Sequence, residues 1–258
     1  MAKSPAHRWG QIIGDALEEA FRPVIGQVAK KYGLYFDYKG ERPARPRLTV
    51  SWQDKYGNAH LLDYVLERGG TEETIGVPVA FIETAFRRYT KHSKNKAQEI
   101  EGAVVPLADT YSHVHPFRGA ILAGVFTSNS LNQLRSRGFE LIYIPYDDVC
   151  KAFATVGIEA GCDESTPDDE FQRKVDQWDR LTEGPRTAVK QALVQVAEAQ
   201  TAKFAETLNS SLARQIQSVT VTVLHGRRHD VTTVTTQSGT SKRIRKRRPA
   251  MRLPCQAI

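Results

Sequence analysis

Residues 77–83, VPVAFIE, form a nearly continuous apolar run that ends in one acid, Glu83. A short run of this kind is typical of a central strand that is covered on both faces. The chain then turns basic, and five cations follow within thirteen residues of Glu83: Arg87, Arg88, Lys91, Lys94 and Lys96. The sequence therefore predicts a buried strand that carries a carboxylate towards a basic helix.

Apolar periodicity predicts the elements around this strand. Helices are expected where apolar residues recur every three or four positions, at 10–32, 94–108, 128–137 and 147–156. Strands are expected at 48–52, 59–67, 119–126 and 139–145, and the first two should pair as a hairpin. Gly, Pro and charge predict a loop at 37–46. This order indicates an α/β fold with a central mixed β-sheet flanked by helices.

A change in composition at 160–170 divides the chain into three expected regions. Residues 1–160 would form the α/β core. Residues 161–240 would form a region for dimerisation or DNA recognition, with helices near 169–181 and 184–214 and a β-hairpin at 217–237. Residues 241–258 are a basic tail.

The basic tail accounts for the charge of the whole chain. Its seven cations and no acid equal the formal net charge of +7, so residues 1–240 are formally neutral. Such a run suits a polyanion, most simply nucleic acid, although a solvated tail is the plainer interpretation.

Several classes of protein are disfavoured by the sequence. No apolar stretch approaches the ~20 residues of a membrane span. Three scattered cysteines without a CxxC pair favour a reducing cytoplasm and disfavour structural zinc. No GxxxxGK[ST] loop is present, so no nucleotide cofactor is expected.

Three acids are expected to approach the end of the central strand from different elements. Asp63 lies inside the otherwise apolar strand 59–67, Glu83 ends the strand 77–83, and Glu18 flanks the apolar face of the first helix. Because an unpaired carboxylate is costly to bury, Asp63 indicates either a functional site or a strand face open to solvent. Converging carboxylates would make a hard oxygen site suited to Mg²⁺.

These elements resemble the PD-(D/E)XK nuclease superfamily, which has the restriction-endonuclease-like fold. The resemblance covers roughly residues 10–146: a helix, a hairpin with Asp63, a strand with Glu83, a basic helix and a strand. It implies that Asp63 and Glu83 bind Mg²⁺ and that Glu18 assists. Leu62 stands where the family motif has proline, and Ala85 stands where it has lysine.

The lysine of the family positions the attacking water, so its absence at Ala85 requires a substitute or implies lost chemistry. Lys91, Lys94 and Lys96 are the candidates, and Lys94 and Lys96 flank the buried face of their helix, so that either could reach back. An engineered inactivating change at Ala85 and a nuclease fold without activity are the other interpretations.

DNA contacts are expected from three places. Arg87 and Arg88 would clamp phosphates, since planar guanidinium groups fit phosphate oxygens. Polar side chains of the helix 128–137 and the hairpin tip HGRRHD would reach bases or phosphates, unless they are merely solvated. These are Asn129, Asn132, Arg135, Arg227 and Arg228.

The resemblance implies a Mg²⁺-dependent endodeoxyribonuclease, most simply a cytoplasmic type II restriction endonuclease that cuts double-stranded DNA at a specific sequence as a homodimer. Two alternatives remain: a catalytically silent nuclease-fold module that binds DNA, and a repair or junction nuclease that recognises DNA structure.

Overall fold

The computed structural model describes residues 4–214, 219–222 and 228–231. The chain divides into two compact units, residues 1–213 and 214–258. No helix among the described residues is long and apolar enough to cross a membrane.

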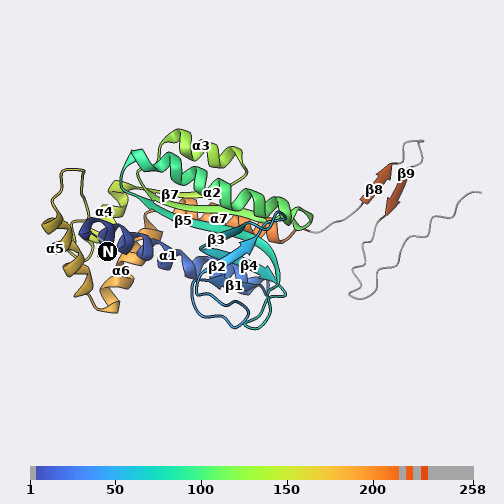
Figure 1. The fold of residues 1–258 in the computed structure, drawn as a ribbon, viewed down its shortest axis with the longest axis horizontal. Helices are drawn as coiled ribbons and strands as arrows, with labels where there is room; N and C mark the ends of the chain where they lie inside the picture. Colours follow the sequence, from blue (N-terminus) through green and yellow to red (C-terminus); the bar gives the residue numbers. More distant parts are fainter. Residues whose placement is uncertain (1–3, 215–218, 223–227, 232–258) are drawn as a thin grey trace, which may run out of the picture. The chain divides into compact units, whose positions relative to one another are not determined.

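A five-stranded mixed sheet forms the centre of the first unit (Figure 1). Its strands, in spatial order, are β1 (Tyr35–Tyr38), β4 (Tyr64–Arg68), β5 (Val77–Arg87), β6 (Phe117–Gly124) and β7 (Glu140–Pro145). The first three strands pair antiparallel, whereas β5, β6 and β7 pair parallel. The predicted α/β class with a mixed sheet flanked by helices is therefore confirmed.

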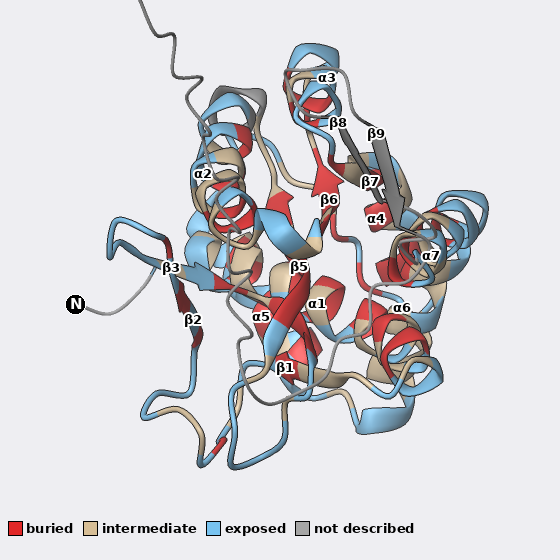
Figure 2. Ribbon diagram, turned by 90° about the vertical axis from the view of Figure 1, so that its right-hand side faces the viewer, coloured by how far each residue is buried: buried red, intermediate tan, exposed pale blue. Residues whose placement is uncertain are grey.

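Two clusters of buried apolar residues lie on the two faces of this sheet, and Figure 2 shows buried segments in the sheet and in the helices around it. One face carries five helices: α1 (Pro5–Lys31), α4 (Tyr146–Ala154), α5 (Asp168–Asp179), α6 (Glu183–Gln195) and α7 (Glu198–Leu212). The other face carries α2 (Thr90–Thr110), α3 (Ser128–Ser136) and a separate hairpin of β2 (Val50–Gln53) and β3 (Ala59–Leu62). A 3-10 turn, η1 (Ser112–Val114), follows α2. Helices α5 to α7 thus pack within the same unit as the sheet.

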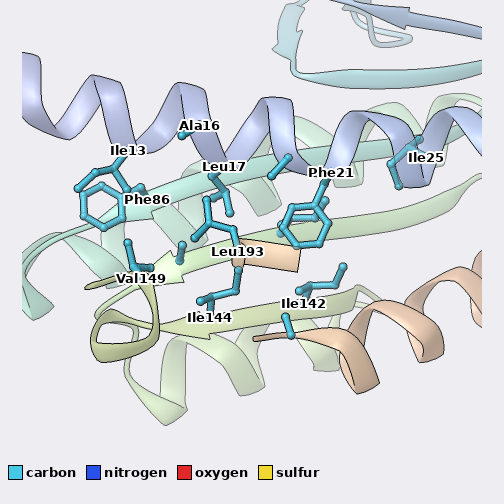
Figure 3. Packing of buried hydrophobic residues seen from close by; sticks show 14 of the residues in the cluster. Ile13, Ala16, Leu17, Phe21, Ile25, Phe86, Ile142, Ile144, Val149 and Leu193 are labelled. Atoms are coloured by element: carbon cyan, nitrogen blue, oxygen red, sulfur yellow. The ribbon is translucent and has the colours of Figure 1, made fainter. Parts of the chain in front are cut away.

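Helix α1 is held against the sheet by its apolar face. Ile13, Leu17, Phe21 and Ile25 are fully buried and face Phe86 and residues of β7 (Figure 3). Burying each such side chain contributes about 1.5–3 kcal/mol. This packing fixes the rotation of α1 about its axis, and hence the direction of the polar side chains that flank the apolar face.

The structure corrects the predicted hairpin. Residues 59–67 are two strands, because β3 pairs with β2 while β4 pairs with β1 and β5. Asp63 is the residue between them, where the chain leaves the small sheet for the large one, so the prediction that it lies within a strand was wrong.

Four further boundaries differ from the predicted ones. Strand β5 continues past Glu83 to Arg87, because its parallel ladder with β6 extends to the pair Arg87 and Gly124. Helix α2 begins at Thr90, and the single helix expected at 184–214 is divided near Val196. The predicted loop at 37–46 begins inside β1.

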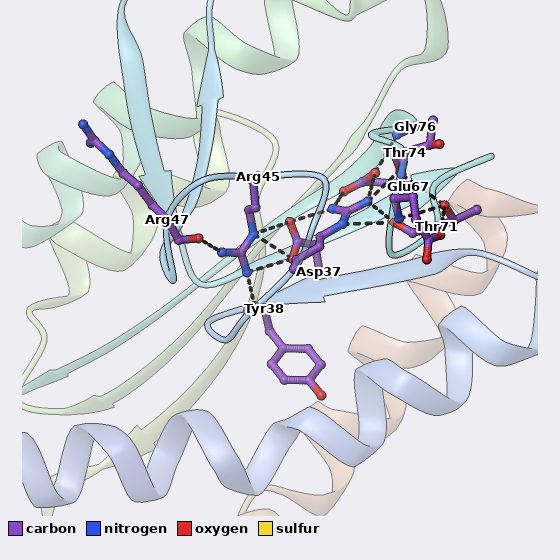
Figure 4. A network of polar contacts seen from close by, with 10 residues as sticks. Asp37, Tyr38, Arg45, Arg47, Glu67, Thr71, Thr74 and Gly76 are labelled. Atoms are coloured by element: carbon purple, nitrogen blue, oxygen red, sulfur yellow. Dashed lines mark hydrogen bonds and ion pairs between the residues drawn. The ribbon is translucent and has the colours of Figure 1, made fainter.

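A buried ionic network ties that loop to the sheet (Figure 4). The Arg42 guanidinium donates to Asp37 at 2.8 Å and to both carboxylate oxygens of Glu67, at 2.6 and 3.0 Å. It also donates to the backbone carbonyls of Thr71 and Thr74. The side chains of Arg42, Asp37 and Glu67 are 1%, 3% and 0% exposed, so water does not replace these bonds.

The second unit is described in two short strands, β8 (Val219–Thr222) and β9 (Arg228–Val231), which pair antiparallel. The hairpin expected at 217–237 is therefore present in its described part. Arg227 and the side chain of Arg228 lie outside the described residues.

Candidate active site

Asp63 and Glu83 meet where β4 and β5 separate. Strand β4 begins at Tyr64, which pairs with Ile82, so the next residues of β5 have no β4 partner. Asp63 takes that place: its carboxylate accepts from the Thr84 amide at 2.7 Å and the Thr84 hydroxyl at 2.9 Å. The Asp63 amide in turn donates to Glu83 Oε1 at 3.2 Å. The two acids are thus held together by the backbone of the sheet.

Glu83 is almost completely buried, at 7% exposed. Burial raises the pKa of its carboxyl well above the ordinary value, and the neighbouring Asp63 charge raises the pKa further. Lys96 opposes this effect, so a cation from α2 lies close enough to act on Glu83.

Glu18 approaches from α1 on the other face of the sheet. The Tyr64 hydroxyl donates to the Glu18 backbone carbonyl, which joins α1 to β4 beside Asp63. Arg22 pairs with the Glu18 carboxylate at 3.1 Å and stacks on the ring of Tyr38. Burial raises the pKa of Glu18, and the Asp63 charge raises it further. The carboxylates of Glu18, Asp63 and Glu83 therefore come from three segments and lie close enough for their charges to repel one another.

The lysines expected to replace the family lysine have different positions relative to the acids. Lys96 is 19% exposed, lies 3.6 Å from Glu99, and lines the pocket beside Asp63. Lys94 is exposed and is not among the residues that line that pocket. The side chain of Lys91 lies outside the described residues. Ala85 is buried against α2, which explains why α2 can come close at this point.

A pocket of about 690 Å³ opens in front of these groups. Its polar wall includes Glu18, Asp63, Thr84, Lys96 and Glu99. Glu83, which accepts from the Asp63 amide, does not itself line the pocket. Side chains of α1, the end of β5 and the first turns of α2 complete it: His7, Gln11, Asp15, Arg87, Arg88, Tyr89 and Asn95.

The two arginines after the strand have different surroundings. Arg87 lies in the pocket, 3.8 Å from Glu99, and is partly exposed. Arg88 donates to the Ala6 carbonyl at 2.7 Å and stacks on Phe171, so much of its guanidinium already joins α1 to α5. Arg87 donates to the Phe86 carbonyl at 2.9 Å. Among the described residues it makes no bond to a helix as short as that from Arg88 to Ala6, so the geometry favours Arg87 over Arg88 as the phosphate contact.

The expected DNA contacts on α3 are not brought to this pocket. Asn129, Asn132 and Arg135 are exposed, and Arg135 donates to Asn132 at 3.3 Å. None of the three lines the pocket. Their role in DNA recognition stays a prediction.

The acids of the site can be compared with the ligands that Mg²⁺ takes in proteins. This ion is usually coordinated by one or two carboxylates together with water and phosphate oxygens. Among the described residues, no group of three or more His, Cys, Asp or Glu side chains is arranged to hold a metal ion. Asp63 and Glu83 nevertheless supply two adjacent hard oxygen donors, and their proximity raises the pKa of Glu83. A pair of this kind fits the ion, which would relieve that repulsion.

Thr84 and Arg22 were not anticipated from the sequence. Thr84 fixes the Asp63 carboxylate, and Arg22 pairs with Glu18. The spacing of four between Glu18 and Arg22 on a helix was a usable signal. The contact between Thr84 and Asp63 depends on strand pairing and has no local signal.

Comparisons with known proteins give little further information. No family model matches the chain, and no curated protein matches it. A solved structure described as "Protein of Unknown Function AF1548" is similar over 71% of this chain and 99% of that one, at 11% identity and a TM-score of 0.31. A likeness at this TM-score supports no conclusion about fold or function.

Replacing Glu83 with glutamine is expected to stabilise the protein in EDTA by about 1–2 kcal/mol at mildly alkaline pH. A carboxyl with a raised folded pKa destabilises the fold as pH rises from its unfolded pKa through its folded pKa. The variant has no such charge, so its advantage should vanish below the ordinary glutamate pKa and grow above it. Urea unfolding across this pH range measures the difference, and an advantage independent of pH would contradict the cause given.

Proposed function

We propose that this chain is a Mg²⁺-dependent endonuclease that hydrolyses phosphodiester bonds of double-stranded DNA. The observation that carries the proposal is the convergence of Glu18, Asp63 and Lys96 on one pocket, with Glu83 buried beside Asp63. The mixed sheet, with Asp63 and Glu83 at the β4–β5 junction and the basic α2 following, supports a restriction-endonuclease-like core.

In this proposal Asp63 and Glu83 hold Mg²⁺, which when bound polarises a phosphate oxygen and lowers the pKa of a water molecule. Thr84 keeps the Asp63 carboxylate oriented. The Lys96 ammonium orients the attacking water and stabilises negative charge that develops on the phosphate. Arg87 contacts a phosphate oxygen, and Glu18 holds a water at the edge of the site.

Recognition of a specific sequence, as in a type II restriction enzyme, is the narrower form of the proposal. A palindromic target would be cut by a two-fold homodimer in which each subunit cuts one strand.

The test is incubation of the purified protein with unmethylated phage DNA in Mg²⁺ and in EDTA. Discrete bands that require Mg²⁺ are the expected result. A smear that requires Mg²⁺ would support the proposed cleavage chemistry but not recognition of a specific sequence. The protein would then be a nonspecific or structure-specific nuclease. No cleavage in Mg²⁺ would contradict the proposal.

One observation favours a second candidate, a nuclease-fold module that binds DNA without cutting it. The Asp63 carboxylate already accepts two hydrogen bonds from Thr84 and so has a structural role without a metal. Such a module would retain DNA in EDTA, with an affinity that falls steeply with salt, and would leave the DNA intact when Mg²⁺ is added.

Replacing Lys96 with glutamine is expected to lower the single-turnover cleavage rate about a hundredfold, because the group that orients the water is lost. Replacing Lys94 with glutamine is the matched control, since that side chain lies on the same helix but outside the pocket. Rates measured at saturating DNA separate this effect from weaker binding. Equal rates for the two variants would exclude Lys96 from the assigned role.

A further inference from the structure

One acid of the pocket lies between the two cations that the proposed function assigns to the phosphate. The Glu99 Oε2 atom is 3.8 Å from Arg87 Nη2 and 3.6 Å from Lys96 Nζ, so a single oxygen faces both cations. Arg87 comes from the end of β5 and Lys96 from α2, and all three side chains line the pocket beside Asp63. A carboxylate oxygen therefore bridges two cations from different elements inside the site.

The stability of α2 does not require this bridge. Lys96 and Glu99 are three residues apart, and pairs at that spacing support a helix by themselves. The contact with Arg87 is different, because it depends on how α2 docks beside the end of β5. The bridge is thus a feature of the pocket and not only of the helix.

The bridge is weak enough to open. Both distances exceed the ~2.7–3.2 Å of a direct hydrogen bond, and the Glu99 side chain is 61% exposed. Ion pairs of this kind contribute little free energy. Phosphate oxygens form shorter and stronger charge-assisted bonds with guanidinium and ammonium groups. An incoming phosphate can therefore take the place of the carboxylate between the two cations.

A pocket that binds a polyanion gains nothing from a fixed acid at this place. The other acids near the phosphate have their own partners: Asp63 accepts from Thr84, and Glu18 pairs with Arg22 at 3.1 Å. Glu99 instead neutralises the cations that would meet DNA. Its position is compatible with DNA binding when the carboxylate leaves the cations as the phosphate arrives.

We propose that the Glu99 carboxylate occupies the place of a substrate phosphate oxygen between Arg87 and Lys96, and that DNA displaces it. This inference rests on the proposed function, because it takes a DNA phosphate as the incoming anion. In the free protein Glu99 inhibits the site. In the complex a phosphate oxygen bridges the two cations, and the exposed Glu99 side chain turns into solvent.

The experiment compares Glu99→Gln with Asp15→Asn. Asp15 is the matched control, because it is an exposed acid of the same pocket and, among the described side chains, forms no ion pair with Arg87 or Lys96. The affinity for a short DNA duplex is measured in EDTA, where no cleavage is expected. Glu99→Gln should bind about fivefold more tightly than the wild type, whereas Asp15→Asn should change the affinity less than about twofold.

A double-mutant cycle separates the bridge from a general effect of charge. In an Arg87→Gln background one of the two ion pairs of Glu99 is already absent, so Glu99→Gln should increase the affinity only about twofold. The effect of Asp15→Asn should be the same in both backgrounds. Thermal unfolding of each variant accompanies the cycle, and Glu99→Gln should melt close to the wild type because the side chain is exposed.

Wild-type affinity in Glu99→Gln, or an equal gain with and without Arg87, would overturn the inference even if the wild type cuts DNA as proposed. Tighter binding that depends on Arg87, together with a wild type that never cuts DNA, would support the bridge while the proposed cleavage fails. Failure of both the wild type and Glu99→Gln to bind DNA in EDTA would overturn the inference.

Discussion

Replacing Asp63 with asparagine is expected to lower the rate of Mg²⁺-dependent DNA cleavage about a thousandfold, or about 4 kcal/mol of transition-state stabilisation. Asp63 is the acid that acts on both of the others: its amide donates to the Glu83 carboxylate, and its charge raises the pKa of both Glu83 and Glu18. Loss of this charge removes one of the two donors that would hold Mg²⁺.

The fold should tolerate this change. The asparagine side-chain oxygen can still accept from the Thr84 amide and hydroxyl, as the carboxylate does at 2.7 and 2.9 Å. Removing a like charge should also lower the pKa of Glu83 in the variant. The thermal midpoint in EDTA should therefore be equal to that of the wild type or higher.

Asp15→Asn is the matched control for Asp63→Asn. Asp15 is an exposed acid that lines the same pocket from α1. The Asp15→Asn variant should cut DNA at a rate within a few-fold of the wild-type rate, measured under single-turnover conditions with Mg²⁺. If the two variants lose activity equally, general negative charge in the pocket matters and the specific role of Asp63 is wrong.

Replacing Arg42 with methionine is expected to lower the free energy of unfolding by about 3–5 kcal/mol. The change leaves the Glu67 carboxylate, at 0% exposed, buried without a cation, and leaves the Asp37 carboxylate, at 3% exposed, with Arg45 as its remaining cation. It also removes the donors to the carbonyls of Thr71 and Thr74. Removing one partner of a buried ionic group is costly because the remaining charge has no water to solvate it.

Urea unfolding measures the loss, with two companion variants. Arg47→Met removes an exposed arginine from the same loop and should change stability by less than about 0.5 kcal/mol. Arg42→Lys keeps the charge but not the planar pair of bonds to Glu67, so it should fall between the two. A loss below about 1 kcal/mol in Arg42→Met would show that the network contributes little.

Local patterns in the sequence predicted most of the central elements. The run 77–83 and the runs at 119–126 and 139–145 became β5, β6 and β7, because a strand covered on both faces needs apolar residues in succession. The apolar row of α1 likewise placed Glu18 on the flank of the buried face, where the structure has it lining the pocket. These features depend only on hydrophobic periodicity, which can be seen within one short segment of the sequence.

Features that depend on distant pairing were missed. The break at Asp63 arises because β3 and β4 join different sheets. Arg42 is buried because it pairs with Glu67, which lies twenty-five residues further along the chain. A charged Gly/Pro segment has the composition of a solvent-exposed loop until its partner is known.

The sequence by itself determined the α/β class, the carboxylate that Glu83 supplies from the central strand and the basic helix that follows this strand. It left Lys94 and Lys96 equivalent, since both flank the buried face of one helix. Only the tertiary structure decided between them, because the docking of α2 on β5 around the small buried Ala85 turns Lys96 towards the acids and leaves Lys94 exposed. Periodicity gives the face of a helix, whereas the distance from that face to a site depends on how the helix packs.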